Sequence, residues 1–382
     1  MTILQNLDAR GTSTAPYVVR RPRLLMTVDA VGGIWRYAME LARALVHHDI
    51  AIYFAGLGPP PSREQVVEAE GLGTLLWLDQ PLDWMAHDAA ALEGIPAAIG
   101  GLVEDQDIDL VHLNVPSQAA RLDVRVPTVA VSHSCVASWW RTVRGTGLPE
   151  EWAWQEKSVR EGFSRADAIV APSGAHAHLL TKCYGPLPGL EVVHNGISSV
   201  LHRRDKEPFA FAAGRWWDEG KNGRIFNEVA ARLDWPLVLA GSATGPSGEA
   251  AGYEGETLGE LPHSRVIDFM QCAGIVVSPS LYEPFGLAAL EGARAGAALA
   301  LADIPVYREL WQDAAVFFDP RDGSSLHEAL TRLISDPGLR SELGERALAS
   351  SRRYSPHLQA EKMVEIYRSL SPVFSKHSSA EA

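Results

Sequence analysis

The chain has 382 residues, of which 46% are hydrophobic and 21% are charged. This length exceeds what one core usually holds and the composition is that of a globular protein, so we expect two packed α/β lobes rather than a disordered or fibrous chain. The 34 Lys and Arg residues against 47 Asp and Glu residues give a net charge of −13, which argues against broad binding to nucleic acid or to an anionic membrane surface.

The chemistry of the cysteines and the N-terminus points to a reducing compartment. Cys135, Cys183 and Cys272 lie far apart, form no metal-spaced pair and are odd in number, which favours reduced thiols over a disulfide framework. Residues 1–16 contain no apolar segment of signal-peptide length, and no later run approaches the length of a membrane-spanning helix. We therefore expect a soluble, cytoplasmic protein without an integral membrane segment.

A glycine loop follows the first predicted strand. The strand is expected at 24–28, the loop at 29–33 and an amphipathic helix at 34–45. Gly32 and Gly33 allow the backbone to approach a ligand closely. The loop does not spell Gly-x-Gly-x-x-Gly, which argues against a dinucleotide site and an NAD-dependent dehydrogenase. From these residues alone, a tight turn without a ligand is an equally good interpretation.

Further strand candidates alternate with helical stretches, a pattern that predicts a parallel sheet covered by helices on both faces. They lie at 50–54, 74–78, 110–113, 128–131, 168–170 and 192–193. Ligands bind at the carboxyl ends of such strands, and His133 stands directly after one of them. A lone histidine is more often structural than functional, but this position makes His133 a candidate.

An aromatic and basic group follows His133 closely in the chain. It comprises Trp139, Trp140, Arg141 and Arg144. These side chains fit either a packed loop or a platform of aromatic and cationic groups for an acceptor.

The second half of the chain opens with a predicted strand at 209–213, and another is expected at 237–240. Arg215 and Lys221 flank the loop after the first of these strands. Two cations at the carboxyl end of a strand can neutralise a diphosphate, although a Gly-Arg pair is weak evidence by itself. The neighbouring Trp216 and Trp217 fit packing between helices.

A strand, a loop and a helix are predicted between 273 and 296. The strand is expected at 273–277, Glu283 lies in the loop, and the helix begins near 285–287. The first backbone N–H groups of a helix lack intrahelical partners, so those of Phe285, Gly286 and Leu287 would suit a phosphate.

Glu283 and Glu291 are eight positions apart. At about 100° per residue, a continuous helix would leave them roughly 80° out of line, so they would serve different parts of one ligand. A carboxylate accepts hydrogen bonds in a fork, which suits the paired hydroxyls of a sugar or a ribose. The alternative is that Glu283 caps the turn and Glu291 is a solvated helix residue.

Around this glutamate pair the chain resembles the retaining glycosyltransferases of the GT-B fold, family 4 (glycosyl transferases group 1). Their signature is a Glu, seven residues and a second Glu in the context Ser-Leu-Tyr-Glu-Pro-Phe-Gly-Leu. The resemblance is strong from about 169 to 367 and weaker before it. It implies an α/β protein with two Rossmann-like, doubly wound domains facing a central cleft.

The resemblance also implies a division of the chain. Residues 1–195 would form the N-terminal, acceptor-side domain, ending at an Asn-Gly turn that begins at Asn195, with the polar segment 198–207 after it. Residues 196–354 would form the C-terminal domain that binds the nucleotide-sugar donor. The helical segment 355–370 would cross back onto the first domain, and 371–382 would be a frayed tail.

Roles for individual residues follow from the resemblance. Glu283 would contact the donor sugar ring and Glu291 the ribose, and the segment 258–262 would lie near the nucleobase. His133 would reach the donor sugar and the reacting centre. The diphosphate would be contacted by the glycine loop across the cleft and by the two cations, that is, by Gly32, Gly33, Arg215 and Lys221. The amides near Phe285, Gly286 and Leu287 would contact the diphosphate or the sugar.

The function that this implies is retaining transfer of a sugar from a nucleotide diphosphate sugar, used as a co-substrate, to an unknown hydroxyl acceptor. We expect no cofactor, no metal site and no nucleic-acid partner. One alternative is a GT-B sugar-nucleotide epimerase, which needs proton-handling carboxylates that the sequence does not identify. The other is a non-catalytic sugar-nucleotide-binding protein, against which the retained candidate residues argue.

Overall fold

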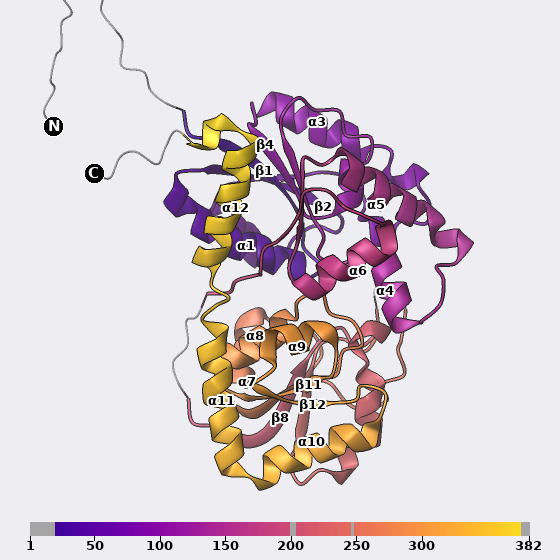
Figure 1. The fold of residues 1–382 in the computed structure, drawn as a ribbon, viewed down its shortest axis with the longest axis vertical. Coiled ribbons are helices and arrows are strands. Elements are labelled where there is room, and N and C mark those ends of the chain that lie inside the picture. Colours follow the sequence, from indigo (N-terminus) through magenta and orange to yellow (C-terminus); the bar gives the residue numbers. More distant parts are fainter. Residues whose placement is uncertain (1–19, 199–203, 246–247, 376–382) are drawn as a thin grey trace, which may run out of the picture.

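The computed structural model describes residues 20–198, 204–245 and 248–375. These residues form two lobes, each built around one parallel sheet with helices on both faces (Figure 1). In this view the upper lobe carries the indigo-to-magenta part of the chain and the lower lobe the orange part. The two doubly wound α/β domains predicted from the sequence are therefore confirmed.

The first sheet has the strand order β3-β2-β1-β4-β5-β6-β7, and all its neighbouring strands are parallel. The strands are β1 (Arg23–Asp29), β2 (Ala51–Leu57), β3 (Thr74–Trp77), β4 (Leu110–Leu113), β5 (Thr128–Val131), β6 (Ala168–Ala171) and β7 (Leu190–Val192). The short strand predicted at 192–193 begins two residues earlier and ends one residue earlier than expected.

Helices cover both faces of this sheet because its strands are apolar on both sides. In β1, Leu24 joins the core on the side of helix α1 (Gly33–Leu45), whereas Leu25 joins the core on the side of α3 (Ile95–Asp105). The other helices of the lobe are α2 (Arg63–Glu70), α4 (Val136–Val143), α5 (Ala153–Arg165) and α6 (Gly174–Tyr184).

The second sheet has the order β12-β11-β10-β8-β9 and is also parallel. Its strands are β8 (Glu207–Ala213), β9 (Leu237–Ala240), β10 (Ala273–Ser278), β11 (Ala298–Ala302) and β12 (Ala315–Phe318). Its helices are α7 (His263–Cys272), α8 (Leu287–Arg294), α9 (Pro305–Trp311), α10 (Gly323–Ser335) and α11 (Pro337–Ser351).

The sequence did not predict β11 and β12. All five residues of β11 are buried, yet they are alanine and leucine only, without the β-branched and aromatic residues that favour strands. Three of the four residues of β12 are only half-buried. The pairing of β11 with β10 on one side and β12 on the other decides their conformation, and local propensity does not.

Helix α12 (Pro356–Leu370) leaves the second lobe and packs beside α1 in the first (Figure 1). Its buried Met363 and Tyr367 belong to the same apolar core as Leu24. The frayed tail predicted from residue 371 is wrong for its first part, because Phe374 packs against Tyr367 with ring centroids 5.6 Å apart and is 4% exposed. Residues 376–382 lie outside the described residues.

Within the three described stretches, no helix is both long and apolar enough to cross a membrane. The prediction about a signal peptide concerns residues 1–16, which lie outside these stretches. The three cysteines are free thiols.

Candidate active site

The predicted site residues lie at the switch points of the two sheets. The strand order reverses between β1 and β4 in the first sheet and between β8 and β10 in the second. At a switch point the loops after neighbouring strands diverge and leave room for a ligand. The loop after β1 carries Gly32 and Gly33, the loop after β8 carries Arg215 and Lys221, and the loop after β10 carries Glu283.

The two switch points face each other across the junction between the lobes. A β-carbon built on Gly32 would lie 3.6 Å from Arg215 Nη1, and one built on Gly33 would lie 3.7 Å from Leu287 Cδ1. Both glycines thus lie against the second lobe, at its cationic loop and at the first turn of α8. Larger side chains at these positions would fill the space between the lobes.

Asp29 shapes the glycine loop at the end of β1. Its Oδ1 accepts a hydrogen bond from the backbone N–H of Val31 at 2.9 Å, and the residue is 6% exposed. Burial raises the pKa of Asp29, while the hydrogen bond from Val31 and the positive charge of Arg215 oppose that rise. The field of Arg215 therefore reaches into the first lobe.

The two tryptophans after Arg215 have different environments. Trp216 is fully buried, and its Nε1 donates a hydrogen bond to the carbonyl oxygen of Ala240 at 2.9 Å. The guanidinium of Arg215 lies over the ring of Trp217, with Cζ 5.3 Å from the ring centroid, and its Nη2 is 3.5 Å from Asp218 Oδ2. Trp216 packs in the core as expected, and Trp217 supports Arg215.

Lys221 and Glu283 form an ion pair, with Nζ 2.5 Å from Oε1. Ser280 Oγ donates a second hydrogen bond to the same carboxylate oxygen at 2.9 Å. The side chain of Glu283 is 10% exposed and that of Lys221 is 23% exposed. The structure therefore joins in one contact the residues predicted to hold the sugar ring and the diphosphate.

Helix α8 starts at Leu287, within the predicted range, and Gly286 is its N-cap. Gly286 has a φ of +88°, a conformation that side chains disfavour, and a β-carbon there would lie 2.6 Å from Tyr307 Cε1. The hydroxyl of Tyr307 is in turn fixed by Ser278 Oγ at 2.6 Å. The free N–H groups at the start of α8 lie near Gly33, the first residue of α1, because Leu287 packs against that glycine.

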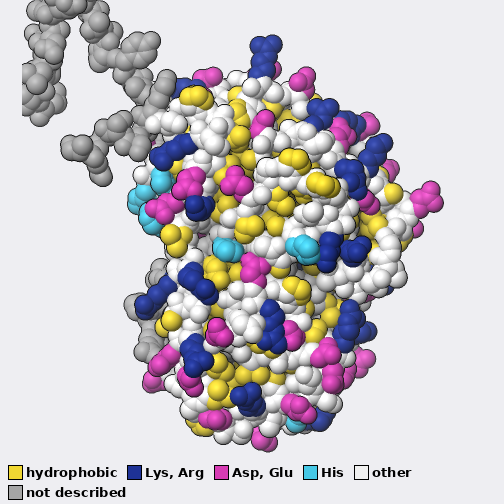
Figure 2. Space-filling view, viewed as in Figure 1, with side chains coloured by type: hydrophobic (Ala, Val, Ile, Leu, Met, Phe, Trp, Pro, Cys, Tyr) yellow, Lys and Arg dark blue, Asp and Glu magenta, His cyan; other side chains and the backbone are white. Residues whose placement is uncertain are grey.

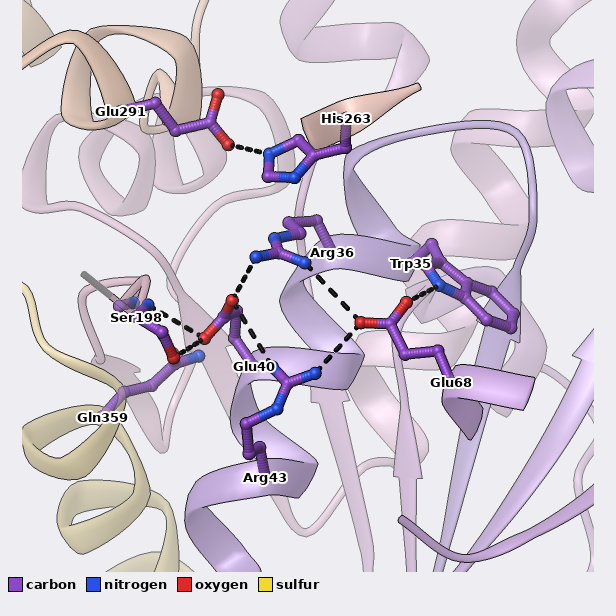
Figure 3. A network of polar contacts seen from close by, with 10 residues as sticks. Trp35, Arg36, Glu40, Arg43, Glu68, Ser198, His263, Glu291 and Gln359 are labelled. Atoms are coloured by element: carbon purple, nitrogen blue, oxygen red, sulfur yellow. Dashed lines mark hydrogen bonds and ion pairs between the residues drawn. The ribbon is translucent and has the colours of Figure 1, made fainter. Parts of the chain in front are cut away.

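Glu291 is buried, which corrects the alternative that it is a solvated helix residue. Its Oε1 accepts a hydrogen bond from Nε2 of His263 at 2.8 Å (Figure 3). His263 directly follows the segment 258–262 that was expected near the nucleobase. Sequence reasoning missed His263, because 28 positions separate it from Glu291 and no spacing marks the pair.

His133 lies after β5, where the sequence placed it. Its Nε2 is 2.9 Å from Asn114 Oδ1, and its ring meets Tyr37 edge to face at a centroid distance of 4.2 Å. Burial, with smaller contributions from the nearby His112 and His176, lowers the pKa of His133 to about 3, so the imidazole is neutral near pH 7.

Two members of the aromatic and basic group reach the second lobe. Trp139 Nε1 donates a hydrogen bond to Asp218 Oδ1 at 3.0 Å, and Arg144 Nη2 lies 2.7 Å from Glu219 Oε1. These contacts favour the interpretation of this group as packed, because it covers the loop between the two predicted cations. An acceptor platform here would be limited to the remaining surface.

More polar contacts join the lobes near the helix starts. Ser173 Oγ donates to the carbonyl oxygen of Pro284 at 2.7 Å, and the two carboxylate oxygens of Glu309 accept from the N–H groups of Gly174 and Ala175 at 2.9 and 2.6 Å. In the face shown in Figure 2, histidine and charged side chains gather along the waist between the lobes. The two lobes are therefore in close contact in this structure.

The chain segment between the lobes is anchored on α1. Glu40, fully buried, accepts hydrogen bonds from the N–H and Oγ of Ser198 at 2.9 and 2.5 Å and pairs with Arg36 (Figure 3). The N–H of Gly196 donates to Gln359 Oε1 of α12 at 2.8 Å. The helix that begins at the glycine loop thus also holds the connection to the second lobe.

The described residues contain no group of three or more His, Cys, Asp or Glu side chains placed to hold a metal ion.

Comparison with known proteins identifies the family. Residues 31–199 match the model of Glycosyltransferase Family 4, and residues 199–349 match that of Glycosyl transferases group 1. The chain is 30% identical over 360 residues to the alpha-maltose-1-phosphate synthase of Mycolicibacterium smegmatis, an alignment that covers 75% of this chain and 88% of the relative. This chain belongs to the group 1 glycosyltransferases. The predicted resemblance to the group 1 glycosyltransferases of the GT-B fold is confirmed.

Solved structures of glycosyltransferases share the fold of this group 1 glycosyltransferase. Sucrose-phosphate synthase from Thermosynechococcus elongatus superposes with a TM-score of 0.74 at 16% identity, over 92% of this chain and 99% of that one. HepE of Anabaena in complex with UDP-glucose gives a TM-score of 0.69 at 16% identity, over 91% and 100% of the two chains. At these identities the likeness shows the GT-B fold.

Proposed function

We propose that this group 1 glycosyltransferase transfers a sugar from a nucleotide diphosphate sugar to a hydroxyl acceptor, with retention of anomeric configuration and without a metal ion. One observation carries the proposal: Arg215 of the second lobe lies against Gly32 of the first, beside the start of α8. Groups suited to one diphosphate thereby come from both lobes to one place.

Two side chains and a helix start of the second lobe place positive charge where the diphosphate binds. Arg215 offers a planar fork for two phosphate oxygens, and Lys221 offers a point charge. The first N–H groups of α8 add partial positive charge in the place that phosphates occupy at helix starts. Preorganised donors of this kind stabilise the charge that develops on the leaving group. The fold shared with HepE, which was solved with UDP-glucose, supports a nucleotide sugar as the donor.

The glutamates bind the two ends of the donor. Glu283, fixed by Ser280 and Lys221, accepts hydrogen bonds from hydroxyls of the sugar ring. Glu291 uses one oxygen for His263 and offers the other to the ribose. The nucleobase lies near the loop after β9, where Leu258 is 45% exposed and the N–H of Gly241 donates to the carbonyl oxygen of Gly259.

In the reaction the bond between the anomeric carbon and the phosphate oxygen breaks while a bond to the acceptor oxygen forms on the same face. The transition state resembles an oxocarbenium ion, and no protein nucleophile is required. The acceptor proton passes to the departing diphosphate, which carries the bonding electron pair. His133, neutral at pH 7, contributes hydrogen bonding at the sugar rather than charge.

The test is a panel of UDP, GDP and ADP, each with its sugar conjugates, in thermal-shift measurements with excess EDTA. A ligand at about 100 times its Kd adds roughly 2.7 kcal/mol of stability, so one nucleotide series should raise the Tm. The increase should be lost in Arg215→Ala. Absence of any stabilisation across the panel would contradict the proposal, and conversion of a stabilising donor without an acceptor would favour an epimerase.

A further inference from the structure

We infer that Tyr367 of α12, acting through His112 and Asn114, holds His133 as its Nε2–H tautomer, so that Nδ1 of His133 remains an acceptor at the junction between the lobes. The inference rests on the proposed function for the contact of His133 with the donor. Tyr367, His112 and Asn114 are positioning residues, since they act on the sugar only through His133.

The orientation of the Asn114 amide is fixed by Thr27 of β1. Asn114 Nδ2 donates to the carbonyl oxygen of Thr27 at 2.6 Å, and the N–H of Asn114 donates to Thr27 Oγ1 at 2.8 Å. Rotating the amide by half a turn would set two oxygens against each other in a buried site, since Asn114 is 1% exposed. Asn114 Oδ1 is therefore an acceptor that faces the histidines.

Two imidazole nitrogens lie against this single oxygen. His112 Nε2 is 3.1 Å and His133 Nε2 is 2.9 Å from Asn114 Oδ1. Because the oxygen can only accept, both nitrogens carry protons. Burial lowers the pKa of His112 to about 4 and that of His133 to about 3, so both rings are neutral and both Nδ1 atoms are unprotonated near pH 7.

Tyr367 completes the arrangement from the other end of the chain. Its hydroxyl lies 2.7 Å from His112 Nδ1, and 255 positions separate the two residues. Both are fully buried. Since His112 Nδ1 lacks a proton, the tyrosine hydroxyl is the donor. Losing this donor would leave His112 free to adopt the Nδ1–H tautomer, whose Nε2 lone pair would repel Asn114 Oδ1. This repulsion would displace the oxygen from His133 Nε2 and weaken its hold on the His133 proton.

The remaining nitrogen of His133 is available to a ligand. Among the described residues none makes a hydrogen bond to Nδ1, and this atom is not one of the enclosed polar atoms without a partner. Tyr37 of α1 packs on the ring, and His112 of β4 and His176 of α6 are the titratable groups that face it. A neutral ring with an open Nδ1 accepts a hydrogen bond from a hydroxyl, the chemistry of a sugar.

The direct test measures protonation at the two nitrogens of each histidine. The full chain is labelled with ¹⁵N-histidine, and the His133 signals are assigned by their loss in His133→Gln. We expect a proton on Nε2 and none on Nδ1 between pH 6 and pH 8. A proton on Nδ1 of His133 in the wild-type protein would overturn the inference, and no variant has to be active for this result.

The second test compares two tyrosine-to-phenylalanine variants. Tyr367→Phe removes the donor to His112, whereas Tyr184→Phe removes a buried hydroxyl outside the network as a matched control. We expect Tyr367→Phe to give a mixture of His133 tautomers and to lower kcat about tenfold with little change in the donor KM, while Tyr184→Phe changes neither. A normal His133 tautomer in folded Tyr367→Phe would overturn the inference, whatever the turnover.

His133→Ala separates this inference from the proposed function. If His133→Ala turns over as fast as wild type, His133 does not contact the donor and that part of the proposed function is wrong. The ¹⁵N measurements on the wild-type protein would still decide the His133 tautomer.

Discussion

Nη1 of Arg215 lies 3.6 Å from the point where a β-carbon on Gly32 would stand, so a side chain of the second lobe reaches the backbone of the first. The two residues come from the switch points of two different sheets, 183 positions apart in the chain (215 − 32). The proposed diphosphate site depends on this approach, because neither lobe alone supplies both the close backbone and the cation.

Adding a side chain at Gly32 should weaken donor binding. Gly32→Val would place two methyl groups in the space next to Arg215, and we expect the affinity for the stabilising nucleotide to fall at least about tenfold, a loss of about 1.4 kcal/mol. Titration calorimetry with the bare nucleotide measures this. As a control, Gly100→Val lies where a β-carbon meets nothing within 4 Å and should leave affinity unchanged. Equal nucleotide affinities for the two variants would show that the diphosphate does not bind next to Gly32.

Alanine substitutions at two glycines, one at each end of α8, distinguish the cost of backbone strain from the cost of steric crowding. Gly286 and Gly296 have φ values of +88° and +70°, so an alanine at either costs about 1–2 kcal/mol. Of the two added β-carbons, only the one at Gly286 would lie 2.6 Å from Tyr307 Cε1, which should add about 1–3 kcal/mol for overpacking. Urea unfolding should therefore show a larger loss in the free energy of unfolding for Gly286→Ala. The same loss in both variants would mean that Tyr307 moves away freely.

The parts of the site that the sequence predicted are those encoded locally. Pro284 and Gly286 mark the turn before α8, and the alternation of apolar strands with helices marks the two sheets. His263 beside Glu291 and Tyr367 beside His112 were not predictable, because their contacts join positions far apart in the chain and depend on how whole lobes pack. The ion pair of Lys221 with Glu283 was missed for the same reason, although both residues were candidates.

Substitutions of Glu283 and Glu291 should have different effects on turnover and on nucleotide affinity. Glu283→Gln keeps the shape but loses the charge that we propose lies next to the sugar, so we expect turnover to fall about 10²–10³-fold with nearly unchanged nucleotide affinity. Glu291→Gln should weaken the proposed charged hydrogen bond to the ribose and lower nucleotide affinity about tenfold. Calorimetry with the bare nucleotide, combined with turnover at saturating donor, distinguishes them. Equal losses of affinity would contradict the assignment of the two carboxylates to different ends of the donor.

Glu309 should make the contact between the lobes depend on pH. Burial by itself would raise its pKa, but hydrogen bonds from His194 and from the N–H groups of Gly174 and Ala175 outweigh this and lower the pKa below its ordinary value. A carboxylate with a depressed pKa in the folded state stabilises the protein above its unfolded pKa, and that stability is lost as pH falls through the folded pKa.

The matched variant is Glu309→Gln, which keeps the shape and removes the titration. We expect its Tm to be a few degrees lower than wild type at pH 7, and the difference to shrink as the pH is lowered below about 4.5. Thermal unfolding from pH 3 to pH 7 measures this. A gap in Tm that does not change with pH would show that the charge of Glu309 does not matter to the contact.

The central claim is that protein groups, and no metal ion, stabilise the negative charge of the leaving diphosphate during sugar transfer with retention. The most direct measurement is the ¹H NMR spectrum of the newly formed glycoside, recorded during turnover of the stabilising donor in excess EDTA. We predict that turnover continues and that the product has the anomeric configuration of the donor sugar. Arg215→Ala should form little or no product under the same conditions. Product of inverted configuration, or turnover that stops with EDTA and returns with magnesium, would contradict the account.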